Sequence, residues 1–151
     1  MKRTIMALLL VAGITLGVKA QDKKMKIDKK DIPQAVTESF NSTFANAKDV
    51  EWKKKGNDYK VSFEMNDTEH YAMLNSSGTV ISQGQEIPES QLPTEISNAI
   101  KKDHPNHRID DVYTVVKDGT TSYKVTFDGS PDRKVMYSSD GTMIKDKVDE
   151  D

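Results

Sequence analysis

Cysteine is absent from the 151-residue sequence. Its absence excludes disulfide bonds, thiol catalysis, cysteine-ligated metal sites and the lipid-modified cysteine of bacterial lipoproteins. Long hydrophobic runs are also scarce, because the only one lies at the N-terminus. The glycines beyond the N-terminal run are expected in turns, so the sequence has no glycine-rich loop of the kind that binds phosphate. A small chain with these absences must obtain its stability from an ordinary apolar core.

The N-terminal run has the features of a cleavable secretory signal peptide. Lys2 and Arg3 form a positively charged start, the stretch 4–18 is apolar, and Val18-Lys19-Ala20 places small or β-branched residues where a signal peptidase reads them. We expect cleavage after Ala20, which leaves a flexible N-terminal segment at 21–30. The run is shorter than the about 20 residues that span a bilayer, although an uncleaved anchor is the alternative. The protein is therefore expected in the periplasm, with secretion as the alternative.

Cleavage of residues 1–20 would leave a more acidic chain. The signal peptide holds three of the 22 basic residues and none of the 24 acidic ones, so the remainder carries a net charge of −5. Nucleic acids and anionic lipids bind proteins largely through neutralisation of their phosphates. We therefore expect no nucleic-acid partner and no membrane association after cleavage. The sequence leaves the oligomeric state open.

An internal repeat organises the rest of the chain. The segment Tyr59-Lys60-Val61-Ser62-Phe63 recurs as Tyr123-Lys124-Val125-Thr126-Phe127. Three further matches keep the same order, and they pair 32–36 with 92–96, 50–52 with 111–113, and 77–81 with 140–144. Collinear matches of this kind predict two repeats, 31–86 and 87–151, joined through the polar stretch 82–91.

Each repeat opens with the signals of a helix and continues with the signals of strands. Pro33 and Pro93 suit a first helical turn, Asp31 is placed to cap the first helix, and apolar residues then recur every four positions. Alternating strands follow, separated by turns such as Asp118-Gly119. The predicted fold class is α+β, with one helix and an antiparallel β-meander in each repeat. Since about 60 residues bury too little surface to be stable alone, we expect one continuous eight-stranded sheet with both helices on one face.

The pattern of these repeats resembles the PepSY-like family of exported bacterial proteins. The matching residues of the second repeat are Leu92-Pro93, His104-Pro105-Asn106, Tyr113, 123–127 and Asp140-Gly141. The first repeat matches less fully, because Ala45-Asn46-Ala47 replaces the proline turn and Ser77 replaces the aspartate. The family is similar to the β-lactamase inhibitory protein, which clasps its target with the exposed face of a tandem-repeat sheet. The resemblance implies an exported, inhibitor-like binding module and supplies no functional residues to carry over.

The alternation of the strands indicates which side chains face away from the core. If Ala72 and Leu74 point into the core, Tyr71 and Met73 point to solvent. Exposed tyrosine and methionine among mixed charges are typical of protein-binding faces, although single exposed aromatic residues also occur without a function. Trp52 and Tyr113 are expected in the core or at its rim. The candidate partner-binding residues are Tyr71, Met73, Lys60, Glu64, Lys124 and Met136.

Signatures of catalysis are missing from the sequence. It contains no Gly-x-Ser-x-Gly and no Ser-x-x-Lys, and its carboxylates are scattered, so we expect neither an enzyme nor a cofactor. His104 and His107 are a weak alternative as zinc or copper ligands. Pro105 breaks the helix that would hold both on one face, which favours a polar turn. The leading hypothesis is non-catalytic binding of another exported or envelope protein, and the alternative is an envelope protein that binds a small ligand or a metal.

Overall fold

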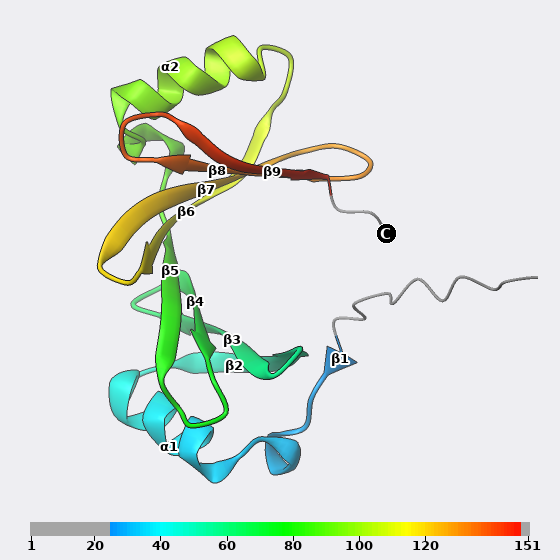
Figure 1. Ribbon diagram of the computed structural model, residues 1–151, viewed down its shortest axis with the longest axis vertical. Helices are drawn as coiled ribbons and strands as arrows, with labels where there is room; N and C mark the ends of the chain where they lie inside the picture. Colours follow the sequence, from blue (N-terminus) through cyan, green and yellow to red (C-terminus); the bar gives the residue numbers. More distant parts are fainter. Residues whose placement is uncertain (1–24, 149–151) are drawn as a thin grey trace, which may run out of the picture.

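The structure is a computed structural model that describes residues 25–148, so the predicted signal peptide lies outside the described residues. Its strands form one nine-stranded sheet in which every strand pairs antiparallel with the next along the chain (Figure 1). The elements in chain order are β1 (Met25–Lys26), η1 (Lys29–Asp31), α1 (Gln34–Thr43), β2 (Lys48–Lys55), β3 (Asp58–Met65), β4 (Thr68–Leu74), β5 (Val80–Glu86), η2 (Glu89–Gln91), α2 (Thr94–Asp103), β6 (Ile109–Lys117), β7 (Thr120–Phe127), β8 (Arg133–Ser138) and β9 (Met143–Val148). Within the segment 21–30, β1 adds a short edge strand to the eight strands of the repeats. Between residues 25 and 148, no helix is both long and apolar enough to cross a membrane.

Both helices begin directly after a proline. The carbonyl of Pro33 accepts hydrogen bonds from the amides of Val36 and Thr37, at 3.0 and 3.3 Å, and Pro93 does the same at the start of α2. Asp31 was expected to cap α1 but lies in η1, because the helix begins only at Gln34. Each helix then buries one side of its apolar stripe against the sheet. The buried helical residues are Val36 and Phe40 in α1, and Ile96 and Ile100 in α2.

The register of the strands places both helices on one face of the sheet. Cross-strand partners share a face, and Val61, Ala72, Gln83 and Val116 are successive partners across β3 to β6. Val61 packs in the core under α1. Val112, which shares the face of Val116, packs in the core under α2. The predicted α+β tandem repeat with one continuous sheet is therefore confirmed.

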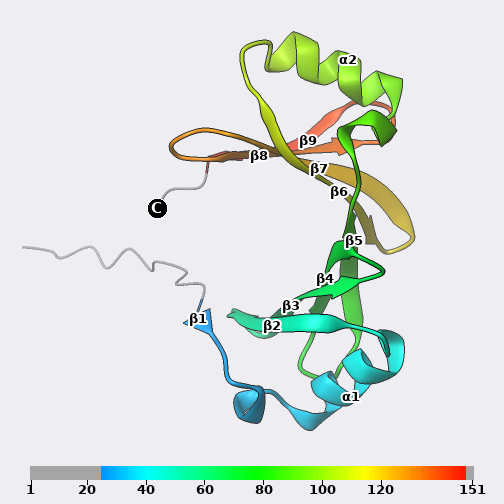
Figure 2. The same cartoon turned by 180° about the vertical axis from the view of Figure 1, so that it is seen from behind.

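The opposite face carries no helix within the described residues and is called the helix-free face. It is formed by the side chains that alternate with those of the core, among them Lys60, Tyr71 and Lys124. The sheet is strongly curved, and α1 and α2 lie at opposite ends of its outer side (Figures 1 and 2). The helix-free face consequently lines the inner side of the curve.

Strand β5 joins the two repeats within the sheet. It continues to Glu86, so part of the polar stretch 82–91 that was expected to be a connection is strand. Five residue pairs link it to β6, from Ser82 opposite Lys117 to Glu86 opposite Tyr113. Its polar helix-side residues 83 and 85 are exposed, because the helices cover only the two ends of the sheet.

The structural equivalence of the repeats differs by one residue from the sequence match around Trp52. Trp52 pairs with Val61, whereas Val125, the counterpart of Val61, pairs with Val112. Trp52 therefore corresponds to Val112, and Tyr113 corresponds to Lys53. A slip of one residue moves a side chain to the other face of a sheet. Trp52 lies in the core as expected, but Tyr113 points to the helix-free face and belongs to neither helix-covered core.

Candidate binding face

The six candidate partner-binding residues lie on the helix-free face. Lys60 is the cross-strand partner of Met73, and Lys124 is the partner of Met136. The two pairs share a face because Tyr71, Gly84, Val115 and Ser122 are successive partners between them. All six side chains, including Tyr71 and Glu64, are half-buried. The strand alternation thus placed them together, and their role in binding stays a prediction.

Tyr71 lies flat across the neighbouring strand because the residue beside it is a glycine. Gly84 is the partner of Tyr71 on β5, and a Cβ atom at Gly84 would lie 2.3 Å from the ring atom Cε1 of Tyr71. The missing side chain lets the Tyr71 ring reach the ring of Tyr113 on β6, with 5.6 Å between centroids. Gly84 had no signal in the sequence beyond its position in a polar stretch.

Tyr113 is the aromatic residue of this face that the sequence assigned to the core or its rim. Only 8 % of its surface is exposed, but its neighbours are side chains of the helix-free face. Its hydroxyl donates a 2.8 Å hydrogen bond to Oε2 of Glu69 on β4. Burial and this bond to Glu69 raise the pKa of Tyr113, so the hydroxyl stays protonated as a donor. A sequence match that aligned Trp52 with Val112 would have assigned Tyr113 to the helix-free face.

Two lysines pack against the tyrosine rings. Nζ of Lys60 lies 4.8 Å from the Tyr71 centroid, and Nζ of Lys124 lies 5.0 Å from Tyr71 and 4.0 Å from Tyr113. All three distances fall within the range of cation–π attraction, which contributes about 0.5–2 kcal/mol depending on exposure. These four residues, Lys60, Tyr71, Tyr113 and Lys124, are called the Lys–Tyr cluster.

The surroundings of the cluster shift the pKa values of its members. Burial, and then the charge of Lys124 and of three further lysines, lowers the pKa of Lys60 to about 8. Burial, and then the charge of Asp111, raises the pKa of Tyr71 to about 12. At neutral pH the cluster therefore presents a charged lysine and a protonated tyrosine hydroxyl.

Carboxylates gather on the other side of Tyr113. Burial raises the pKa of Glu86, and the nearby charges of Glu69 and Asp111 raise it further, whereas Lys124 opposes the shift. One carboxylate oxygen of Asp111 is buried and has no hydrogen-bond partner among residues 25–148. The helix-free face is therefore divided into a lysine-rich area and an acidic area, with the two tyrosines between them.

His104 and His107 lie at the junction of α2 and β6. The amide of His104 donates to the Ile100 carbonyl at the end of α2, and the amide of His107 closes a turn on the His104 carbonyl. His104 is buried and its ring lies 4.7 Å from that of Phe127, whereas His107 is exposed. The two imidazole rings are 5.4 Å apart and edge-on. In the part of the chain that the structure describes, no three His, Cys, Asp or Glu side chains form a group that could hold a metal ion.

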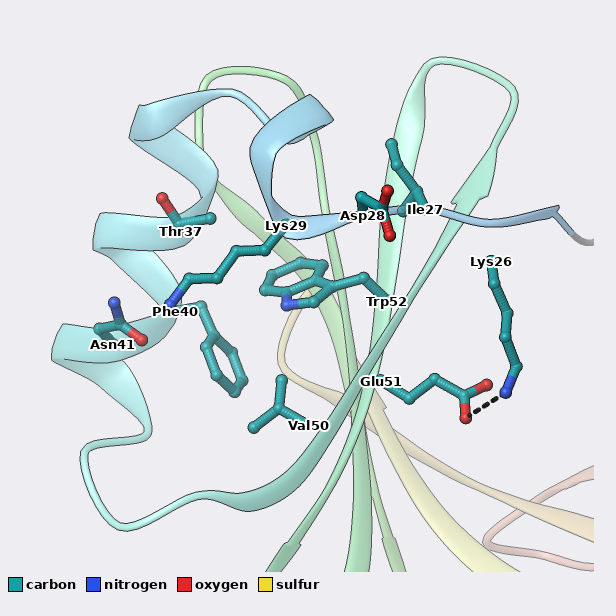
Figure 3. Close-up of a pocket in the computed structure, with 10 residues that line it drawn as sticks. All are labelled: Lys26, Ile27, Asp28, Lys29, Thr37, Phe40, Asn41, Val50, Glu51 and Trp52. Carbon is teal, nitrogen blue, oxygen red and sulfur yellow. Dashed lines mark ion pairs between the residues drawn. The ribbon is translucent and has the colours of Figure 1, made fainter.

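A cavity of about 330 Å³ lies between β2, η1 and α1, a place that the sequence did not indicate (Figure 3). Phe40 and Trp52 form its apolar wall, with their rings edge-on at 5.2 Å. Glu51 at its rim is paired with Lys26 at 3.2 Å. The cavity therefore combines an aromatic wall with a charged rim.

Comparison with sequence families identifies the class of this protein. The model of the PepSY-like family, described as "Putative beta-lactamase-inhibitor-like", matches residues 18–82 and again residues 76–145. The chain therefore belongs to the PepSY-like family, and the resemblance of its repeats is confirmed. No curated protein sequence matches it significantly.

Solved structures of Bacteroides proteins share the fold. A protein from Bacteroides eggerthii described as a "putative periplasmic" protein has a TM-score of 0.68 at 11 % identity, over 78 % of this chain and 88 % of that chain. A DUF2874 family protein from Bacteroides uniformis has a TM-score of 0.66 at 15 % identity, over 77 % and 88 %. A BLIP-like protein from Bacteroides fragilis has a TM-score of 0.62 at 19 % identity, over 80 % and 89 %. At these identities the likeness concerns the fold alone.

Proposed function

We propose that this protein is an exported, non-catalytic binding module that grips another envelope or secreted protein, in the manner of an inhibitor, with its helix-free face. The observation that carries the proposal is the Lys–Tyr cluster at the centre of that face. Tyrosine, with its large rigid ring and one polar atom, is among the residues that contribute most to protein interfaces. The inhibitor-like family and the BLIP-like structure support the same class of function.

The shape of the sheet supports a protein partner as well. The helix-free face lines the inner side of a curved sheet, so a convex loop or edge of another protein can contact several strands at once (Figure 2). The two helices brace the ends of the sheet through their apolar cores. A preformed curved face needs little ordering when a partner binds, which lowers the entropic cost of association. The proposed location is the periplasm, since the N-terminal pattern predicts export and a structural relative is described as periplasmic.

Site-specific photo-crosslinking in the source cell tests this proposal. A photoreactive phenylalanine analogue replaces Met73, which lies half-buried on the helix-free face. The matched control carries the analogue at Asn98, an exposed position of α2 on the other side of the sheet. We expect a discrete protein adduct from position 73 and none from position 98. The same adducts from both positions, or none from position 73, would refute binding through this face.

A second candidate function is binding of a small ligand in the cavity beside Trp52. Its volume of about 330 Å³ lies at the lower end of the range for small-molecule sites. Trp52 is the only tryptophan in the sequence, so its fluorescence reports directly on this cavity. A ligand that changes the Trp52 emission of wild type should lose this effect in a Val50→Phe variant, because the larger side chain would fill the cavity beside Trp52. Unchanged emission across a metabolite panel would count against this function.

A further inference from the structure

Lys60 is a half-buried cation without an ion pair. No carboxylate within residues 25–148 forms a salt bridge with it, and its Nζ lies against the Tyr71 ring. Its neighbour Lys53, in contrast, is paired with Glu51 at 3.0 Å. A cation withdrawn from water is costly unless an anion compensates for it. The position of Lys60 therefore calls for an anion that the described part of the chain does not supply.

No carboxylate of the same face forms a salt bridge with Lys60 within residues 25–148. Glu51 is already paired with two lysines, Lys26 and Lys53. Glu69 accepts the hydroxyl of Tyr113. Glu64 is on the strand of Lys60 but four residues along, a separation of about 13 Å. The described residues therefore leave the charge of Lys60 available to an external anion.

Tyr71 adds a hydrogen-bond donor beside this cation. Its ring contacts Nζ of Lys60 at 4.8 Å, and within the described residues its hydroxyl makes no hydrogen bond. Burial and Asp111 keep the Tyr71 pKa at about 12, so the hydroxyl remains a donor. The lysine would supply the charge for a bound carboxylate, and the tyrosine would supply an aromatic surface and a donor on the same face.

The charges around the cluster favour a single carboxylate over an extended polyanion. Glu64, Glu69 and Glu86 flank the lysine-rich area on the same face. These acidic side chains would repel the neighbouring phosphates of a nucleic acid or of an anionic membrane. A single acidic side chain on a protein loop can approach Lys60 with less repulsion from these glutamates than a row of phosphates would experience.

We propose that the Lys–Tyr cluster is a receptor for one aspartate or glutamate side chain, carried by an exposed loop of the partner protein. This inference rests on the proposed function and names the chemistry of its partner. Tyr71 and Tyr113 would pack against the loop around that carboxylate, and Lys60 would pair with it. The specificity of the face would then lie in the position of one acidic residue on the partner.

The first test uses a defined probe, the capped peptide acetyl-Gly-Glu-Gly-amide, with acetyl-Gly-Gln-Gly-amide as its neutral counterpart. Titration of the full chain is followed by NMR at the ring signals of Tyr71 and Tyr113, which remain in every variant tested. We expect saturable shifts with the glutamate peptide only, and a Lys60→Gln variant should bind it about tenfold or more weakly, as expected for loss of a charged hydrogen bond. Lys60→Arg, which keeps the charge, should retain binding, and Lys101→Gln on the exposed surface of α2 should bind as wild type. Equal shifts with both peptides, or undiminished binding by Lys60→Gln, would overturn the inference.

The pH dependence of peptide binding gives an independent readout. The charged and titratable groups around Lys60 are Lys53 and Lys55 on β2, Tyr71 on β4, Lys124 on β7 and Lys134 on β8. Since the pKa of free Lys60 is about 8, affinity for the glutamate peptide should fall between pH 7 and pH 9. Bound carboxylate should raise that pKa, and a tenfold coupling corresponds to about one pKa unit. A pH-independent affinity would contradict pairing with Lys60.

The photo-crosslinking experiment separates this inference from the proposed function. A partner captured at position 73 whose contact segment contains an acidic residue, and whose capture Lys60→Gln weakens, supports both. A partner captured equally well by Lys60→Gln leaves the binding face in place and refutes the carboxylate receptor. Tighter binding of inorganic phosphate than of the glutamate peptide would likewise refute it in favour of a phosphate-bearing ligand.

Discussion

At the scale of single residues, the position of the Tyr71 ring on the helix-free face depends on the absence of a side chain at Gly84. A Cβ atom there would lie 2.3 Å from Cε1 of Tyr71, a distance that side-chain carbons do not tolerate. Gly84→Ala should therefore displace the Tyr71 ring and destabilise the protein by about 1–3 kcal/mol, as overpacking of this kind does. Urea denaturation measures the change. Ser82→Ala, on the same strand and face, is the matched control and should unfold close to wild type.

A second prediction at this scale concerns the hydroxyl of Tyr113. Its 2.8 Å hydrogen bond to Glu69 is part-buried and charge-assisted. Tyr113→Phe should lower the free energy of unfolding by about 1.5–3 kcal/mol, because the Glu69 carboxylate loses its donor. Tyr123→Phe, on the neighbouring strand, serves as the control. Equal urea midpoints for the two variants would show that the bond contributes nothing specific.

Residues such as these mark how far the sequence could predict the site. Tyr71, Met73 and Lys60 were found because strict alternation assigns each strand residue to a face. Tyr113 is buried, as predicted, but its face of the sheet was missed because the repeats were matched one residue out of step, and β-bulges near Lys48 and Ile109 obscure the correct step. The contact of Lys60 with Tyr71 and the approach of Tyr71 to Gly84 were beyond prediction, since both depend on the strand register and on side-chain conformations.

At the scale of elements, the helices were more predictable than the strands that join them. A proline followed by an apolar stripe with a spacing of four residues defined both helices, because each stripe faces an apolar core. Strand β5 extends to Glu86, into the polar stretch 82–91 that was predicted to be a connection. Its remainder lacks apolar alternation, since Gln83 and Gln85 lie on the part of the sheet that neither helix covers.

The packing of α2 on the sheet leads to a prediction about pH. Burial of His104 against Phe127, and then the charge of Arg133, lowers the pKa of His104 below its usual 6.5. His107 acts in the same direction, whereas the carboxylates Asp146 and Asp103 oppose it. As the pH falls, His104 therefore takes up a proton at a higher pH in the unfolded chain than in the folded chain. The resulting stability is complete above about pH 6.5 and is lost as the pH falls below it.

Replacing the histidine should remove this contribution. The urea midpoint of wild type should fall from pH 7.5 to pH 5 by more than that of a His104→Leu variant, because leucine has no proton to bind. His107→Gln, at the exposed neighbour, removes only a smaller cause of the His104 shift and should keep most of the wild-type dependence. If the urea midpoints of wild type and His104→Leu fell equally between pH 7.5 and pH 5, other groups would be responsible for the loss of stability in acid.

At the scale of the whole molecule, the two repeats have separate apolar cores but one sheet. The core under α1 and the core under α2 share no residue. Their mechanical connection is the β5–β6 ladder, whose residue pairs run from Ser82–Lys117 to Glu86–Tyr113. The Lys–Tyr cluster spans the same junction, since Lys60 and Tyr71 come from the first repeat and Tyr113 and Lys124 from the second. The Lys–Tyr cluster is therefore complete only when both repeats are folded.

This dependence predicts that damage to one core is felt in the other. Ile96 is fully buried under α2, and Ile96→Ala should cost about 2–5 kcal/mol. Trp52 lies in the opposite core and is the only tryptophan, so its fluorescence follows the first repeat alone. If the β5–β6 ladder and the cluster couple the repeats, the Trp52 transition should move to lower urea concentration in Ile96→Ala and coincide with loss of circular dichroism. Asn98→Ala, on the exposed side of α2, should leave the transition in place. A Trp52 transition that Ile96→Ala does not move would mean that the repeats unfold independently, and the helix-free face would then be assembled from two separately stable halves.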